Sequence, residues 1–164
     1  LHHYPQAACY SSIDYLYICL MKTKKVPTVK IIIAELDKGG YHLFLNVKLN
    51  GKKCRFLIDT GASKSVIDKS YFEKNFGSKN LKTIKQETTG LHSSVPESYF
   101  GVVNEFGIGK LTVKKYNMAA VDLSHVNMTY GKLKKPKIHG ILGSDILYQY
   151  KMIIDYGQQK ILMP

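Results

Sequence analysis

The sequence predicts a mainly β protein, built as one small domain around a closed, barrel-like core. Short apolar runs are separated by turn residues about every ten residues, as in small β barrels. No internal repeat, low-complexity tract or long amphipathic helix follows Met21. The chain has 164 residues, 45% of them hydrophobic, which is enough to bury one core but leaves no room for a second domain.

The clearest strand prediction is a hairpin around Asn50-Gly51. Apolar side chains at every second position of residues 43–49 predict a strand with one buried face. Asn-Gly favours a two-residue type I′ turn, because both central positions of that turn have positive φ. A return strand is therefore expected over residues 52–58. The other predicted strands are residues 28–34, 81–88, 95–104, 110–122, 139–142, 151–155 and 160–163.

Two short helices are expected between the strands. The first begins after Asp68, whose carboxylate can cap the helix, and ends at Gly77. The second follows Ser144 and extends to Tyr150. The complete prediction is a small closed β barrel with one or two short helices.

The first twenty residues are interpreted as a non-native or upstream lead segment, because Met21 is followed by a run typical of protein starts, Lys-Thr-Lys-Lys. The single domain is then residues 21–164. The apolar run over residues 15–21 is shorter than the roughly 20 residues that cross a bilayer, so no membrane contact is predicted. Three cysteines without metal-ligand spacing favour a reducing compartment, and we expect a cytoplasmic location.

The chain is strongly basic, with 24 Lys and Arg against 12 acidic residues and a formal net charge of +12. Arg55 is the only arginine. Specific recognition of bases and phosphates depends on the guanidinium group, so a surplus of lysine fits a solvated surface better. The basic run over residues 132–137 is interpreted as a solvated loop. Specific nucleic-acid binding is therefore not predicted, and it would be recognised by a steep dependence of affinity on salt.

The strongest candidate for chemistry is Asp59, which follows the apolar run 56–58 and precedes Thr60, Gly61 and Ala62. The glycine permits a tight turn, which can direct backbone N–H groups toward the carboxylate. A carboxylate at the end of a buried strand needs such hydrogen bonds to remain ionised. The loop can therefore present an acid at the bottom of a cleft. The alternative is an acid that only stabilises its own turn.

The sequence Asp59-Thr60-Gly61-Ala62 resembles the active-site loop of retropepsin-like aspartic proteases of the bacterial single-domain type. The segment Ile141-Leu142-Gly143, followed by a short helix, resembles the part of these proteases that packs against the catalytic loop. Thr89-Gly90-Leu91 lies where they carry the flap hairpin, and residues 152–162 resemble their closing strands. The resemblance covers roughly residues 41–164.

The resemblance implies a retropepsin-like single-domain acid protease fold that is active as a homodimer. It assigns catalysis to Asp59, Thr60 and Gly61, with Thr60 bonding across the dimer and Gly61 bringing the backbone close to the shared proton. Substrate binding is assigned to Ala62 and to the flap residues Thr89, Gly90 and Leu91. Support of the catalytic loop is assigned to Ile141, Leu142 and Gly143.

Peptide hydrolysis by carboxylates requires two of them, one ionised and one protonated. The chain has one Asp-Thr-Gly, and Asp122, Asp145 and Asp155 lie in other contexts, so the second carboxylate must be Asp59 of another copy. Two adjacent carboxylates share one proton, which predicts a mildly acidic optimum. Because Ala62 stands where a serine could hydrogen-bond the carboxylate, activity is expected to extend toward neutral pH.

The predicted function is an aspartic endopeptidase that cleaves extended peptides with water activated by Asp59 of both subunits. The alternative is a noncatalytic dimer of the same fold that binds peptides or serves as an interaction module. No cofactor is predicted, and no metal site, because the histidines are scattered singly. Cys54 is interpreted as a core residue, and Asp145 and Asp155 as structural acids.

Overall fold

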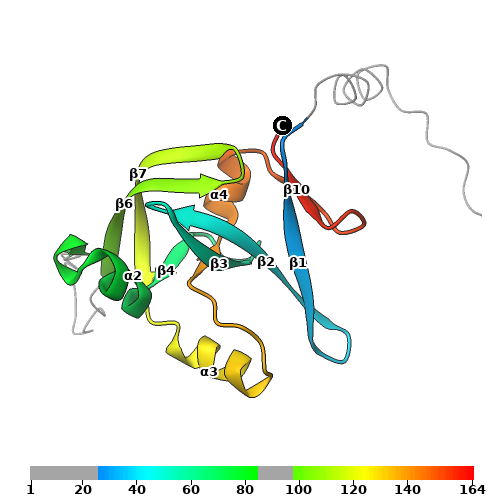
Figure 1. Ribbon diagram of the computed structural model, residues 1–164, viewed down its shortest axis with the longest axis horizontal. Coiled ribbons are helices and arrows are strands. Elements are labelled where there is room, and N and C mark those ends of the chain that lie inside the picture. The colour runs from blue at the N-terminus through cyan, green and yellow to red at the C-terminus, as the bar shows by residue number, and fades with distance from the viewer. Residues whose placement is uncertain (1–25, 85–97) are drawn as a thin grey trace, which may run out of the picture.

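The computed structural model describes residues 26–84 and 98–164 of the chain (Figure 1). Three α-helices and one 3-10 helix lie among the described residues: α2 (Lys69–Phe76), α3 (Ser124–Lys132), α4 (Ser144–Gln149) and η1 (Ser78–Asn80). The strands are β1 (Thr28–Asp37), β2 (Gly40–Leu49), β3 (Lys52–Ile58), β4 (Val66–Asp68), β5 (Leu81–Ile84), β6 (Ser98–Ile108), β7 (Leu111–Val121), β8 (Gly140–Leu142), β9 (Ile153–Asp155) and β10 (Lys160–Leu162).

The strands of the described residues form one 10-stranded sheet in the order β5-β6-β7-β4-β8-β3-β2-β1-β10-β9. An additional pairing between β6 and β2 closes the middle of this sheet on itself. The strands that form the resulting barrel are β2, β3, β8, β4, β7 and β6. The predicted fold class, mainly β with a small closed barrel, is therefore confirmed. At one end of the order, β9 is an edge strand.

The hairpin between β2 and β3 forms as the sequence predicts. Asn50 and Gly51 have φ angles of 47° and 81°, which are the positive values of a type I′ turn. The strands pair in antiparallel register from Leu49↔Lys52 to Leu43↔Ile58. The alternating side chains Leu45, Val47 and Leu49 are buried in the main core.

Helix α2 begins and ends where predicted. At its start, the Asp68 carboxylate accepts a hydrogen bond from the backbone N–H of Tyr71 at 2.7 Å. Gly77 ends the helix with a φ of 85°. Helix α4 also forms where it is predicted. The predicted strand over residues 81–88 is observed as β5, and its remainder lies outside the described residues.

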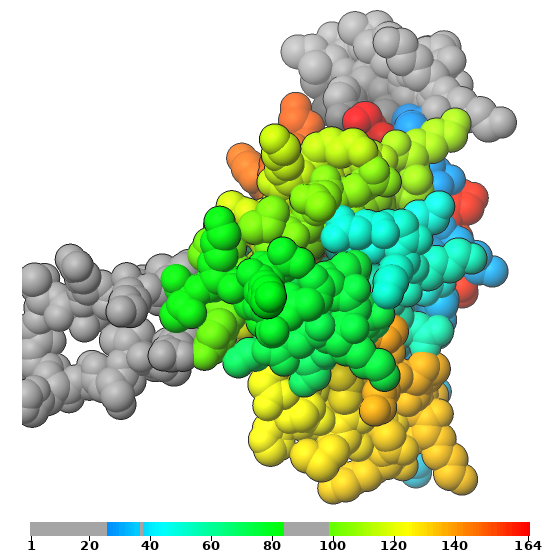
Figure 2. Space-filling model, turned by 60° about the vertical axis from the view of Figure 1, so that its left-hand side comes forward, coloured from blue at the N-terminus to red at the C-terminus, as the bar shows by residue number. Residues whose placement is uncertain are grey.

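The prediction of one or two helices is wrong, because α3 is a third one. No side chain caps its first turn, and Gly131 lies within it, so the usual start and stop signals are missing. Helix α3 depends on packing instead: a second core cluster joins Leu123 and Tyr130 to Phe44 of β2 and to Ile138. Figure 2 shows α3 and the segment after it protruding from the barrel next to α2. No described helix is long and apolar enough to cross a bilayer.

Candidate active site

Asp59 lies directly after β3, where the chain leaves the barrel wall. Strand β8 runs between β3 and β4, pairing Ile58 with Leu142 on one side and Val66 with Ile141 on the other. The backbone N–H of Asp59 donates to the carbonyl of Leu142 at 3.0 Å. The loop that connects β3 to β4 therefore passes over the end of β8, and residues 59–62 and 141–143 are brought together.

The loop is a tight turn around the Asp59 carboxylate. The N–H of Gly61 donates to Oδ1 of Asp59 at 2.9 Å, whereas the N–H of Ala62 donates to the Asp59 carbonyl at 3.2 Å. A Cβ at position 61 would lie 3.3 Å from that Oδ1 atom, so the glycine gives the backbone room to approach. Asp59 is half-buried, and Thr60 is exposed. The turn thus presents the acid and the threonine hydroxyl at the surface of one chain.

Gly143 fixes the base of this loop by close backbone contact. A Cβ at Gly143 would lie 2.7 Å from the carbonyl carbon of Lys64 and 2.8 Å from the carbonyl oxygen of Ala62. Ser144 donates to the same Ala62 oxygen from its N–H at 2.8 Å and from its hydroxyl at 3.0 Å. Only glycine fits between these groups without moving the loop. The flap predicted at Thr89, Gly90 and Leu91 lies outside the described residues.

The sequence does not predict a partly buried hydrogen-bond network that lies behind the loop. Asp145 accepts hydrogen bonds from the N–H and the hydroxyl of Ser65, from the N–H of Ile146 and from the hydroxyl of Tyr116. The Ser65 hydroxyl also accepts the N–H of Gly143 at 2.9 Å. Burial raises the pKa of Asp145, but these hydrogen bonds outweigh burial and hold that pKa below its usual value. Asp145 is therefore a structural acid.

An open hollow of about 270 Å³ lies in front of Asp59. Asp59 is the only acid among the described residues that line it. The lining residues are Tyr41, His42, Leu43, Leu57, Ile58, Asp59, Thr60, Ile154 and Tyr156. A second hollow of about 590 Å³ shares Thr60 and Ile154 with the first and is bordered by Tyr148 of α4. Thr60 thus stands between two hollows that both reach β9.

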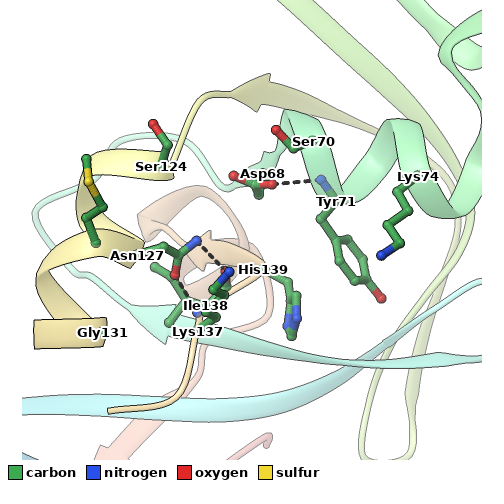
Figure 3. A pocket seen from close by; sticks show the side chains of 11 residues that line it. Asp68, Ser70, Tyr71, Lys74, Ser124, Asn127, Gly131, Lys137, Ile138 and His139 are labelled. Atoms are coloured by element: carbon green, nitrogen blue, oxygen red, sulfur yellow. Dashed lines mark hydrogen bonds between the residues drawn. The ribbon is translucent and has the colours of Figure 1, made fainter. Parts of the chain in front are cut away.

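A third hollow, of about 690 Å³, lies between α2 and α3 and does not include Asp59 (Figure 3). Asp68 lies in its wall, but its two oxygens accept the N–H groups of Tyr71 and Leu123, which ties the start of α2 to the start of α3. The Asn127 amide bonds both the N–H and the carbonyl of Ile138. These polar groups are already engaged in holding the helices, so this hollow has no assigned chemistry.

The other candidate side chains have structural contacts. Burial raises the pKa of the Cys54 thiol, which lies 3.0 Å from the Tyr71 hydroxyl in the core. Nδ1 of His139 accepts a hydrogen bond from the N–H of Arg55 at 3.0 Å. Burial is the main cause that lowers the pKa of His139, and the charge of Arg55 lowers it further. Within residues 26–84 and 98–164, no cluster of three or more His, Cys, Asp or Glu side chains is placed to bind a metal ion.

Residues 45–146 match the protein-family model described as Aspartyl protease, and this range contains the Asp59 loop and Ile141–Gly143. A solved structure of a retropepsin-like aspartic protease from Rickettsia conorii is similar, with a TM-score of 0.50 and 23% identity over 85% of this chain and 94% of that one. The retroviral protease-like domain of Ddi1 from Leishmania major has a TM-score of 0.47 and 14% identity, covering 75% of this chain and 94% of that one. No curated protein sequence matches the chain.

Proposed function

This chain belongs to the aspartyl protease family, and we propose that it is an aspartic endopeptidase whose active site is assembled from two copies of the chain. The observation that carries this proposal is the presentation of Asp59 at the mouth of an open hollow that contains no second acid among its described lining residues. Hydrolysis needs a general base and a general acid together. One chain therefore supplies half of the required pair.

The surface around Asp59 supports a two-fold contact with a second copy. Tyr41 and Tyr156 line its hollow and are 57% and 60% exposed, while Tyr148 beside the second hollow is 87% exposed. Among the described strands, β9 is an edge strand, and it borders both hollows through Ile154. Exposed aromatic side chains and edge strands are features of protein interfaces. A dimer across this face would bring the two Asp59 loops together.

In such a dimer the two carboxylates share one proton and hold a water molecule between them. The ionised carboxylate takes a proton from the water as its oxygen attacks the peptide carbonyl, and the protonated carboxyl donates a hydrogen bond to the carbonyl oxygen. The C–N bond then breaks, and the leaving amine receives the proton that the carboxylate took from the water. An extended peptide fits a cleft of this kind through backbone hydrogen bonds.

The proposal is tested by cleavage of an unfolded protein between pH 4 and 8, using wild type, Asp59→Asn and the matched control Asp122→Asn, because Asp122 is exposed and lines neither of these hollows. Sedimentation of the same samples measures the dimer fraction. We expect cleavage by wild type and the control, and none by an Asp59→Asn protein that remains dimeric. A folded wild-type dimer that binds peptides without cleaving them would instead support the noncatalytic alternative.

A further inference from the structure

His42 lies across the β2–β3 ladder from Asp59. The register pairs Phe44 with Leu57 and Leu43 with Ile58. One step further along the ladder, His42 stands opposite Asp59. Both His42 and Asp59 line the same hollow. An imidazole therefore borders the space in which the proposed carboxylate pair acts.

Tyr130 of α3 holds this imidazole from behind. The Tyr130 hydroxyl and Nδ1 of His42 are 2.7 Å apart, and the two rings meet edge-on with centroids 5.9 Å apart. Tyr130 is 2% exposed and is fixed in the second core cluster with Phe44, Leu123 and Ile138. In the described part of the chain, Nδ1 is the ring nitrogen of His42 that has a hydrogen-bond partner. The ring position is therefore determined by the fold.

The charge of Asp59 acts within the same group of side chains. Burial raises the pKa of Tyr130, and the negative charge of Asp59 raises it further. The phenol therefore keeps its proton. It can donate to Nδ1 of the neutral ring, and its oxygen can accept Nδ1–H of the imidazolium. Tyr130 is thus hydrogen-bonded to His42 and lies within range of the charge of Asp59.

Among the described residues, Asp59 is the acid that lines the hollow together with His42. On β1, Ala34 pairs with His42, and the next residue, Glu35, is exposed and bonded to the N–H of Gly39. Arg55 on β3 pairs with Asn46, further along the ladder. The other polar aromatic side chains that line the hollow are Tyr41 and Tyr156. Among the described residues that line this hollow, His42 is the one basic side chain.

We propose that His42, positioned by Tyr130, sets the acid limit of the pH range in which the Asp59 pair works. This inference rests on the proposed protease function. A positive imidazolium beside the carboxylates favours their ionised form. The pair then keeps the single negative charge that it needs as general base down to a lower pH. His42 acts on the carboxylates and not on the substrate.

The experiment compares the pH dependence of kcat/KM for wild type, His42→Gln, His42→Lys and His125→Gln. Glutamine can still bond Tyr130 but carries no charge, so we expect the acid limb to move up by about half a pH unit, a roughly threefold loss of kcat/KM on that limb. Lysine restores a positive charge and is expected to keep the limb near its wild-type position. His125 is exposed on α3 and serves as the matched control, with no shift expected.

A second readout does not require cleavage. The titration midpoint of the Asp59 carboxyl carbon, followed by NMR in the full chain, is expected to rise in His42→Gln and to rise less in Tyr130→Phe, which keeps its ring packing. Equal midpoints in wild type and both variants would overturn the inference, whether or not the protein cleaves peptides. If the midpoint differs between wild type and His42→Gln but the wild-type dimer cleaves no peptide, the protease proposal is overturned instead.

Discussion

The carboxylate of Asp145 accepts hydrogen bonds from both the N–H and the hydroxyl of Ser65, at 3.0 and 2.7 Å. Because Ser65 is 2% exposed and also receives the N–H of Gly143, the pair joins the start of α4 to the end of the Asp59 loop. The loop is thus held from behind by an acid that does not face the hollow. This arrangement separates Asp145, which supports the loop, from Asp59, which we propose acts in it.

Replacing Asp145 with asparagine tests this support. Asparagine keeps one acceptor oxygen but removes the charge, so the hydrogen bonds from Ser65 weaken. At least one donor that now bonds the second oxygen of Asp145 loses its acceptor. We expect the free energy of unfolding to fall by about 1–3 kcal/mol. Urea titration measures this change. Asp155→Asn is the matched control, because Asp155 accepts one N–H, from Gln158, in a surface turn, and it is expected to change stability by less than about 0.5 kcal/mol.

The same carboxylate predicts how stability depends on pH. Burial raises the pKa of Asp145, but its hydrogen bonds bring that pKa below the usual value of 3.8 in the folded chain. A group with a depressed pKa stabilises the fold above its unfolded-state pKa, and this contribution is lost as pH falls through its folded-state pKa. Wild type is therefore expected to lose stability below about pH 4, and Asp145→Asn to lose less over the same range. Urea midpoints between pH 2 and 6 measure the difference, and parallel curves would contradict the assignment.

The parts that were predictable from sequence depend on local chemistry. Asn50-Gly51 selects its turn through the two positive φ angles, and Asp68 caps α2 through a residue three positions away. The Asp59 loop is local too, because its carboxylate bonds the N–H of Gly61. Each of these signals is carried by a few consecutive residues, so it can be read without knowing the fold.

The parts that were missed depend on contacts between distant residues. Helix α3 has no capping signal, although Leu123, Val126 and Tyr130 follow a helical spacing that would have indicated its buried face. The contacts of Ser65 with Asp145 and of His42 with Tyr130 join residues separated by 80 and 88 positions. No local pattern encodes such pairs, because they arise only when the barrel closes.

Gly143→Ala is expected to disturb the Asp59 loop. The added methyl group would lie 2.7–2.8 Å from backbone atoms of Lys64 and Ala62, which can make room only if the loop moves. We expect a loss of about 1–3 kcal/mol in stability and at least a roughly tenfold fall in kcat/KM, since small displacements of catalytic groups are costly. Gly131→Ala is the control: nothing lies within 4 Å of its added Cβ, so stability should stay level or rise by up to about 1 kcal/mol.

The proposed dimer face is tested by Tyr148→Glu, with Met128→Glu as its control. Tyr148 is 87% exposed and borders the hollow that contains Thr60, whereas Met128 is 55% exposed and lines the hollow between α2 and α3. In a two-fold dimer each introduced charge meets its own copy or must be buried, so Tyr148→Glu should weaken dimerisation at least about tenfold. Sedimentation equilibrium measures the dissociation constant, and a parallel assay at high protein concentration should recover the wild-type cleavage rate. If Met128→Glu weakens dimerisation and Tyr148→Glu does not, the interface lies on the α2–α3 side of the molecule.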